Sequence, residues 1–189
     1  MQTARGRPRD TSVEQRIEQA VVELLSEAGF AGTSIEGVAQ LSGLSRPTIY
    51  RRYADRLTMI NSVVAELLAR DSPPPTDHPD PYENVCWHLK DTIRMLTQTP
   101  IGPIYRAVLP ELPRHAALAE LVNKIGSARR KKLNIAIDRA LAAGVLVING
   151  DVDAATDGLV GAIYFRYLMA SRALGPGYAE KLLQPYLPG

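Results

Sequence analysis

The chain has 189 residues with 46% apolar and 22% charged side chains and a formal net charge of +2 at pH 7, which is typical of a soluble globular protein of one or two domains. A single cysteine excludes an intramolecular disulfide, and no apolar run reaches the ~18 residues of a membrane span. The polar, arginine-rich N-terminus lacks the apolar segment of a secretory signal, so we expect a cytoplasmic protein with no membrane partner.

The first residues predict a flexible basic arm over residues 1–11. Arg5 and Arg7 are separated by Gly6 and followed by Pro8, a composition that keeps a segment narrow and extended. Arginines in such a segment can enter a minor groove, as in an AT-hook, so we expect Arg5 and Arg7 to contact DNA. A basic tail with diffuse phosphate contacts is an alternative that so short a motif leaves open.

Short amphipathic patterns over residues 12–70 predict a domain built on a three-helix helix-turn-helix unit. The first pattern stops at Gly29, and a capping box of Thr33 with Glu36 predicts the start of the second helix, which runs to Leu41. Ser45 predicts the start of the third helix, with Pro47 tolerated in its first turn. A further helix is expected over 57–68.

The segment from Ser34 to Tyr53 has the spacing of a helix-turn-helix. Ala39 is small enough for two helices to touch, and Gly43 tolerates the left-handed conformation that the tight turn requires. The third helix would present arginine and threonine side chains outward at a length that fits the major groove. An ordinary packed helical hairpin is the alternative, which this exposed polar set disfavours.

The stretch from Phe30 to Arg56 resembles the DNA-binding signature of the TetR family, the tetracycline-repressor-like regulators. The resemblance is clearest over residues 12–68 and looser over 145–187. One departure is Arg56-Leu-Thr, where the family commonly has Lys followed by Glu. The resemblance implies that these side chains contact DNA: Thr33, Ser34, Arg46, Pro47, Thr48, Tyr50, Arg51, Arg52, Tyr53 and Arg56.

The implied contacts divide into three kinds. Thr33 and Ser34 would meet a phosphate at a helix N-terminus. Arg46, Pro47 and Thr48 would lie against base edges, and Arg51 or Arg52 would contact either bases or phosphates. Tyr50, Tyr53 and Arg56 would hold backbone phosphates, with core packing as the alternative for each tyrosine.

The proline-rich segment 71–81 predicts a linker, and residues 82–189 predict a second, helical domain for ligand binding and dimerisation. Helices are expected over 85–96, 104–109, 116–143, 154–172 and 178–186, with Gly144 ending the longest and Asp153 starting the next. Val145 to Ile148 looks extended but is too isolated to build a sheet, so the fold class is all-α.

The segment 154–172 is apolar nearly all round, so it requires cover from its own core and from a further surface. A second copy of the chain is the economical partner, and the resemblance implies a dimer interface built from the last two helices, for which we expect Leu159, Ile163 and Tyr167. Complete burial within one subunit is the alternative. Candidate ligand-binding side chains, each with plain core packing as its alternative, are Trp87, Met95, Tyr105 and Tyr164.

These features predict a ligand-responsive transcriptional repressor that binds a palindromic DNA operator as a homodimer and responds to a small-molecule effector. We expect no catalytic residue, metal or cofactor. Cys86 and His88 point about 200° apart on a helix, so they cannot readily share a metal or a proton. A ligand-independent or architectural DNA-binding protein is the alternative function.

Overall fold

The computed structural model describes residues 11–71, 78–170 and 172–189, and within these ranges every regular element is a helix. The predicted all-α class is therefore confirmed. No helix in these ranges is both long and apolar enough to cross a membrane. In chain order the elements are α1 (Thr11–Glu27), α2 (Gly29–Gly32), α3 (Ile35–Ser42), α4 (Arg46–Tyr50), α5 (Arg56–Arg70), α6 (Pro81–Gln98), α7 (Ile101–Val108), a 3-10 helix (Leu109–Arg114), α8 (Ala116–Ala142), α9 (Val152–Tyr164), a π-helical turn (Phe165–Met169), α10 (Tyr178–Leu183) and a 3-10 turn (Gln184–Tyr186).

Local capping explains where the N-terminal helices begin and end. Gly29 and Gly43 take the left-handed conformation, with φ of 70° and 63°, which ends α1 and makes the turn after α3. The Ser45 hydroxyl accepts from the Thr48 amide at 3.4 Å, and the Asp55 carboxylate accepts from the Thr58 amide at 2.7 Å. This second contact lowers the pKa of Asp55.

The predicted cap at Thr33 is wrong by one residue. Ser34 caps α3, and its hydroxyl accepts from the Gly37 amide at 3.0 Å. Thr33 is buried instead, and its hydroxyl donates to the Gly29 carbonyl at 2.9 Å.

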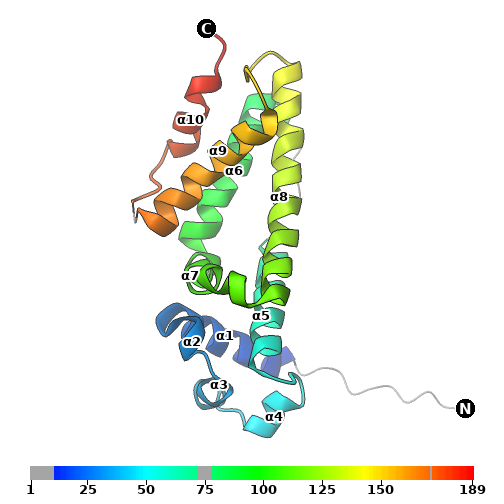
Figure 1. Cartoon of the computed structure of the whole chain (residues 1–189), viewed down its shortest axis with the longest axis vertical. Helices are drawn as coiled ribbons and strands as arrows, with labels where there is room; N and C mark the ends of the chain where they lie inside the picture. The colour runs from blue at the N-terminus through cyan, green and yellow to red at the C-terminus, as the bar shows by residue number, and fades with distance from the viewer. Residues whose placement is uncertain (1–10, 72–77, 171) are drawn as a thin grey trace, which may run out of the picture.

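The C-terminal helices lie at the other end of the molecule, where α6, α8 and α9 pack together and α10 packs on α6 (Figure 1). The predicted cap at Asp153 is wrong by two residues, because the Asp151 carboxylate accepts from the Asp153 amide at 2.8 Å and starts α9 there. Asp153 lies in the first turn and accepts from the Asn134 amide at 2.7 Å.

The two ends of the molecule are joined by packed helices. α7 packs on α1 and α2, and α5 runs beside the lower part of α8 (Figure 1). Phe30 meets His115 with ring centroids 4.9 Å apart. A side chain at Gly102 would collide with the Leu96 carbonyl and the Tyr167 hydroxyl, so glycine is what lets α7 pack this closely.

Candidate nucleic-acid interface and internal cavity

Helix α4 turns a polar face to solvent while a single apolar residue anchors it. Ile49 is fully buried, whereas Pro47 and Arg51 are exposed. The Arg46 side chain is 59% exposed and lies 3.3 Å from the Glu36 carboxylate, and Tyr50 is 50% exposed. A short helix held by one buried residue therefore presents a guanidinium and a phenol outward.

The neighbouring predicted residues are less exposed. Thr48 is half-buried, and its hydroxyl lies 2.9 Å from that of Ser45. Arg52 is half-buried and donates to the Thr48 carbonyl at 3.3 Å, and Tyr53 packs against the core. Thr48, Arg52 and Tyr53 therefore lie at the border of the exposed face that carries Arg46.

Two predicted phosphate contacts need correction. Thr33 is buried with its hydroxyl bonded internally, so it has no surface to offer a phosphate. The Arg56 guanidinium donates to the carbonyls of Thr33 and Phe30 and stacks on the Phe30 ring with its carbon 4.6 Å from the centroid. The structure thus gives Arg56 an internal role, holding α5 against the end of α2. Ser34 is half-buried with its hydroxyl engaged in the cap.

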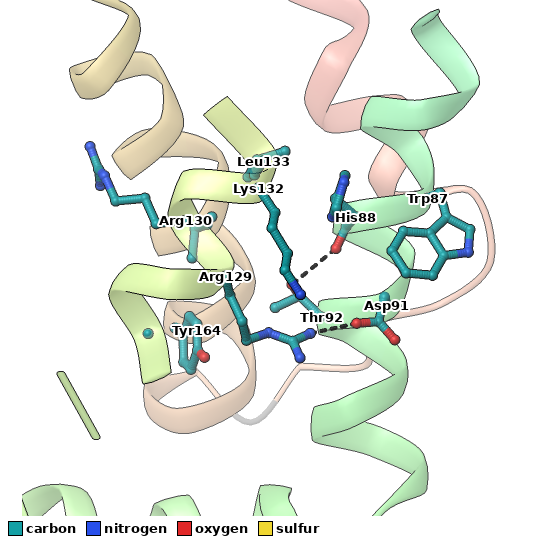
Figure 2. Close-up of a pocket in the computed structure, with 11 residues that line it drawn as sticks. Trp87, His88, Asp91, Thr92, Arg129, Arg130, Lys132, Leu133 and Tyr164 are labelled. Atoms are coloured by element: carbon teal, nitrogen blue, oxygen red, sulfur yellow. Dashed lines mark hydrogen bonds and ion pairs between the residues drawn. The ribbon is translucent and has the colours of Figure 1, made fainter. Parts of the chain in front are cut away.

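A cavity of about 210 Å³, here called the first cavity, lies between α6, α8 and α9 (Figure 2). Its walls combine aromatic and aliphatic side chains with several charged ones. The residues that line it are Trp87, His88, Asp91, Thr92, Gly126, Arg129, Arg130, Lys132, Leu133, Val160 and Tyr164.

A second, more open cavity of about 490 Å³ lies next to the first and shares Gly126, Arg130 and Tyr164 with it. It extends toward Tyr105 on α7 and Val122 on α8. Burial raises the pKa of both tyrosines, Tyr105 and Tyr164.

A buried ion-pair network borders the first cavity. Asp91, whose side chain is 8% exposed, accepts from Arg129 at 2.5 Å and from Arg94 at 3.0 Å. Figure 2 shows Arg129 reaching from α8 across to Asp91 on α6. Arg94 also donates to Asp71, the residue that follows α5, at 3.2 Å. A continuous chain of ion pairs therefore runs from the cavity wall to the end of α5.

The electrostatic environment of the first cavity is positive. Burial lowers the pKa of His88, and the nearby Arg129 and Lys132 lower it further, against the opposing effect of Asp91. Arg130 is neutralised by Asp153 at 3.3 Å and by Asp157. A ligand group in the first cavity is therefore surrounded by side chains with a net positive charge.

Comparison with known proteins identifies the family. A family model described as "Tetracyclin repressor-like, C-terminal domain" matches residues 75–185, and one described as "Bacterial regulatory proteins, tetR family" matches residues 17–63. The chain belongs to the TetR family. Its members are transcriptional regulators, and this chain is accordingly a DNA-binding, ligand-responsive transcriptional regulator.

Relatives of the TetR chain match over nearly their whole length. The chain is 25% identical to the uncharacterized HTH-type transcriptional regulator YdeS of Bacillus subtilis. The alignment spans 190 residues and covers 100% of this chain and 95% of YdeS. A TetR transcription regulator from Haloarcula marismortui has a TM-score of 0.76 at 17% identity, covering 94% of this chain and 100% of that one. The flavonoid-responsive regulator FrrA has a TM-score of 0.65 at 21% identity, covering 92% of each chain. The structural matches show a shared fold.

Against this TetR framework, the predicted ligand-binding residues are partly brought together. Trp87 and Tyr164 line the first cavity, and Tyr105 lines the second. Met95 lines neither cavity, because it lies a turn beyond the last cavity residue of α6 and is buried in the core.

Sequence reasoning missed the charged residues of the first cavity. The available signal was the run Arg129-Arg130-Lys131-Lys132 inside α8. Four consecutive helical residues span about 300° around the axis, so at least one must face the helices that pack on α8.

The predicted interface residues of α9 also need correction. Leu159 and Ile163 are buried within the chain, so neither has surface left for a partner. Tyr167 is half-buried beneath the Arg106 guanidinium, whose carbon is 4.4 Å from the ring centroid. In the π-helical turn that follows α9, Phe165 and Met169 are the large apolar residues that are exposed, at 61% and 76%. Arg5 and Arg7 lie outside the described residues, and their contact with DNA stays a prediction.

Proposed function

We propose that this TetR-family chain is a cytoplasmic repressor that binds a two-fold symmetric operator as a homodimer and releases it when a small molecule binds the first cavity. The exposed face of α4 is the observation that supports operator binding. Arg46 and Tyr50 are exposed on a short helix that the fully buried Ile49 anchors. The exposed guanidinium of Arg46 suits bidentate contact with guanine, while Tyr50 and Arg51 suit phosphate contact.

A partner surface on the segment after α9 supports the homodimer. Phe165 and Met169 are exposed large apolar side chains on the one-turn π-helix Phe165–Met169. Exposed apolar clusters of this kind mark protein–protein contacts. Phe165→Glu should convert a dimer into monomers in sedimentation experiments, and an unchanged sedimentation coefficient would remove this surface from the interface.

Footprinting tests the operator arrangement. Two α4 helices related by a dyad should protect an inverted repeat whose half-sites are about one helical turn apart or slightly more. Protection of a single asymmetric half-site would contradict a two-fold dimer on DNA.

The chain of ion pairs from the cavity to α5 supports ligand control. The contacts run from Arg129 to Asp91, then to Arg94, and end at Asp71 beside the last turn of α5. A ligand that draws Arg129 away from Asp91 alters the partner set of Arg94 and hence its hold on Asp71. Arg94→Gln should therefore retain ligand binding but reduce the effect of the ligand on operator affinity, and an unaltered effect would show that coupling uses another route.

The chain acts, in this proposal, by binding and not by catalysis. Cys86 is fully buried, and burial raises the pKa of its thiol, which keeps it in the unreactive protonated form.

A further inference from the structure

We propose that the first cavity takes an organic monoanion, a carboxylate on a small ring or hydrocarbon body, held by Arg129 and Lys132. This assignment rests on the proposed function, because it specifies the chemistry of the effector. It follows from the charge balance, the shape and the apolar walls of the cavity.

The charge balance leaves one positive charge for a ligand. Three cationic side chains line the cavity, and Arg130 is neutralised by Asp153 and Asp157 while Arg129 shares Asp91 with Arg94. Lys132 has no carboxylate within ion-pair distance among the residues that the structure describes, although it is half-buried. Lys132 is therefore a positive charge that is still available at the cavity wall, so a ligand with a single negative charge would be favoured here.

Arg129 and Lys132 are placed to act together. They are three residues apart on α8 and so lie on the same side of that helix. Figure 2 shows both side chains extending from α8 toward α6, where Thr92 adds a hydroxyl to the wall. The guanidinium fork matches the two oxygens of a carboxylate, and the ammonium adds a point charge.

The cavity also has apolar walls, and its volume suits a small ligand body. Trp87, Leu133, Val160 and Tyr164 supply aromatic and aliphatic walls. An apolar cavity of roughly 150 Å³ holds benzene. The 210 Å³ of the first cavity therefore suits a six-membered ring that carries a carboxylate.

Gly126 is independent evidence that this space serves a ligand. It lies within the 27-residue helix α8, where glycine costs roughly 0.5–1 kcal/mol relative to alanine. A Cβ at this position would meet no atom within 4 Å, so helix packing does not require glycine. The residue lines both cavities, so a large side chain at this position would occupy space beside them.

The experiment uses the full chain and its single tryptophan as reporter, since Trp87 lines the cavity. The protein is titrated with benzoate, cyclohexanecarboxylate and phenylacetate. For each acid, the carboxamide and the amine with the same hydrocarbon body are titrated in parallel. N-acetyltryptophanamide serves as the control for direct quenching. We expect the acids to bind about 10- to 100-fold more tightly than the amides, because hydrogen bonds to a charged group exceed neutral ones.

Matched lysine variants locate the charge. Lys132→Met should reduce the preference for acid over amide by about tenfold while leaving amide binding unchanged, and Lys132→Arg should restore the preference. Lys131→Met is the control, because Lys131 is exposed on the same helix and does not line the cavity. Thermal unfolding of each variant verifies the fold.

The outcomes separate the two proposals. Amides or amines that bind as tightly as acids, or an acid preference that survives Lys132→Met, would overturn the anion assignment and leave a ligand-responsive repressor standing. If no compound of the panel changes Trp87 fluorescence, the first cavity takes no small ring carboxylate and the anion assignment fails, whereas ligand control of operator binding is tested separately by operator titration.

Discussion

Arginine has different surroundings at the two ends of the molecule. On α4, Arg46 is 59% exposed and pairs with the exposed Glu36 at the surface. Beside the first cavity, the Arg129 side chain is 19% exposed and lies 2.5 Å from Asp91, which is itself 8% exposed. An exposed charge contributes little to the stability of the fold and remains available to a polyanion. The energy of a buried ion pair, in contrast, changes when a new charge is placed beside it. In the proposed function, the exposed side chains are the ones that contact DNA, and the buried pair is the one that responds to a ligand.

Arg56 breaks this comparison, because it belongs to the DNA-binding end and yet has internal partners. Arg56→Gln should lower the free energy of unfolding by about 1.5–3 kcal/mol, since the Thr33 and Phe30 carbonyls lose a charged donor. Urea unfolding measures the change, and Arg51→Gln is the exposed control. Unchanged stability together with a smaller salt dependence of DNA binding would return Arg56 to the phosphate-contacting set.

Arg46→Ala tests the exposed arginine of this comparison. Operator affinity should fall by about 1–3 kcal/mol per half-site, with relaxed preference at the contacted base pair. The free energy of unfolding should stay within about 0.5 kcal/mol, because the side chain is exposed. Binding of operator and scrambled DNA measures the effect, and Glu36→Gln is the control that frees Arg46 without removing it. An equal loss on scrambled DNA would make Arg46 a phosphate contact.

Acidification should distinguish the cavity from the DNA-binding end. The pKa of His88 is lower in the folded chain than its ordinary value of 6.5, chiefly because of burial. The unfolded chain therefore binds more protons between these two values, and the free energy of unfolding falls as the pH falls through that window, by at most about 1.4 kcal/mol per pH unit. Above the ordinary value His88 contributes no pH dependence. Urea unfolding measured from pH 7.5 downward should show this fall in the free energy of unfolding. His88→Asn should remove the part of the fall that begins just below the ordinary pKa of histidine, and an identical profile in the variant would exclude His88 as the cause.

The smallest effect concerns the glycine in α8. Gly126→Ala should raise the free energy of unfolding by roughly 0.5–1 kcal/mol, because alanine restricts the unfolded chain and meets no atom in the folded one. Gly158→Ala in α9 is the matched control, as its Cβ would also meet nothing within 4 Å. Only the larger Gly126→Leu should block ligand binding. A destabilising Gly126→Ala would mean that the space is needed by the fold itself.

Local chemistry explains what the sequence could predict at the DNA-binding end. The glycine turn at Gly43 and the cap at Ser45 depend on neighbouring residues alone, and both are found where they were expected. The misplaced caps at Thr33 and Asp153 have one cause. In each case two possible capping residues lie one or two positions apart, and the residue that does not cap has another partner: Thr33 donates to the Gly29 carbonyl, and Asp153 accepts from Asn134.

The cavity could not be predicted in the same way. Its walls come from α6, α8 and α9, whose mutual rotation is set by long-range packing and not by neighbouring residues. The preference for aromatic and methionine side chains selected Trp87 and Tyr164, which line the first cavity, but also Met95, which is buried in the core. The pairing of Asp91 with Arg129 links residues 38 positions apart, which no local pattern reveals.

Operator affinity measured with and without a bound carboxylate tests the central claim most directly. A labelled inverted-repeat operator is titrated with the protein in the presence and absence of saturating cyclohexanecarboxylate, for the native chain and for Gly126→Leu. We expect the ligand to weaken operator binding by about 5- to 150-fold in the native chain and to have no effect on the variant, whose own operator affinity should match that of the native chain without ligand. A carboxylate that binds beside Trp87 and leaves operator affinity unchanged would contradict ligand-controlled repression.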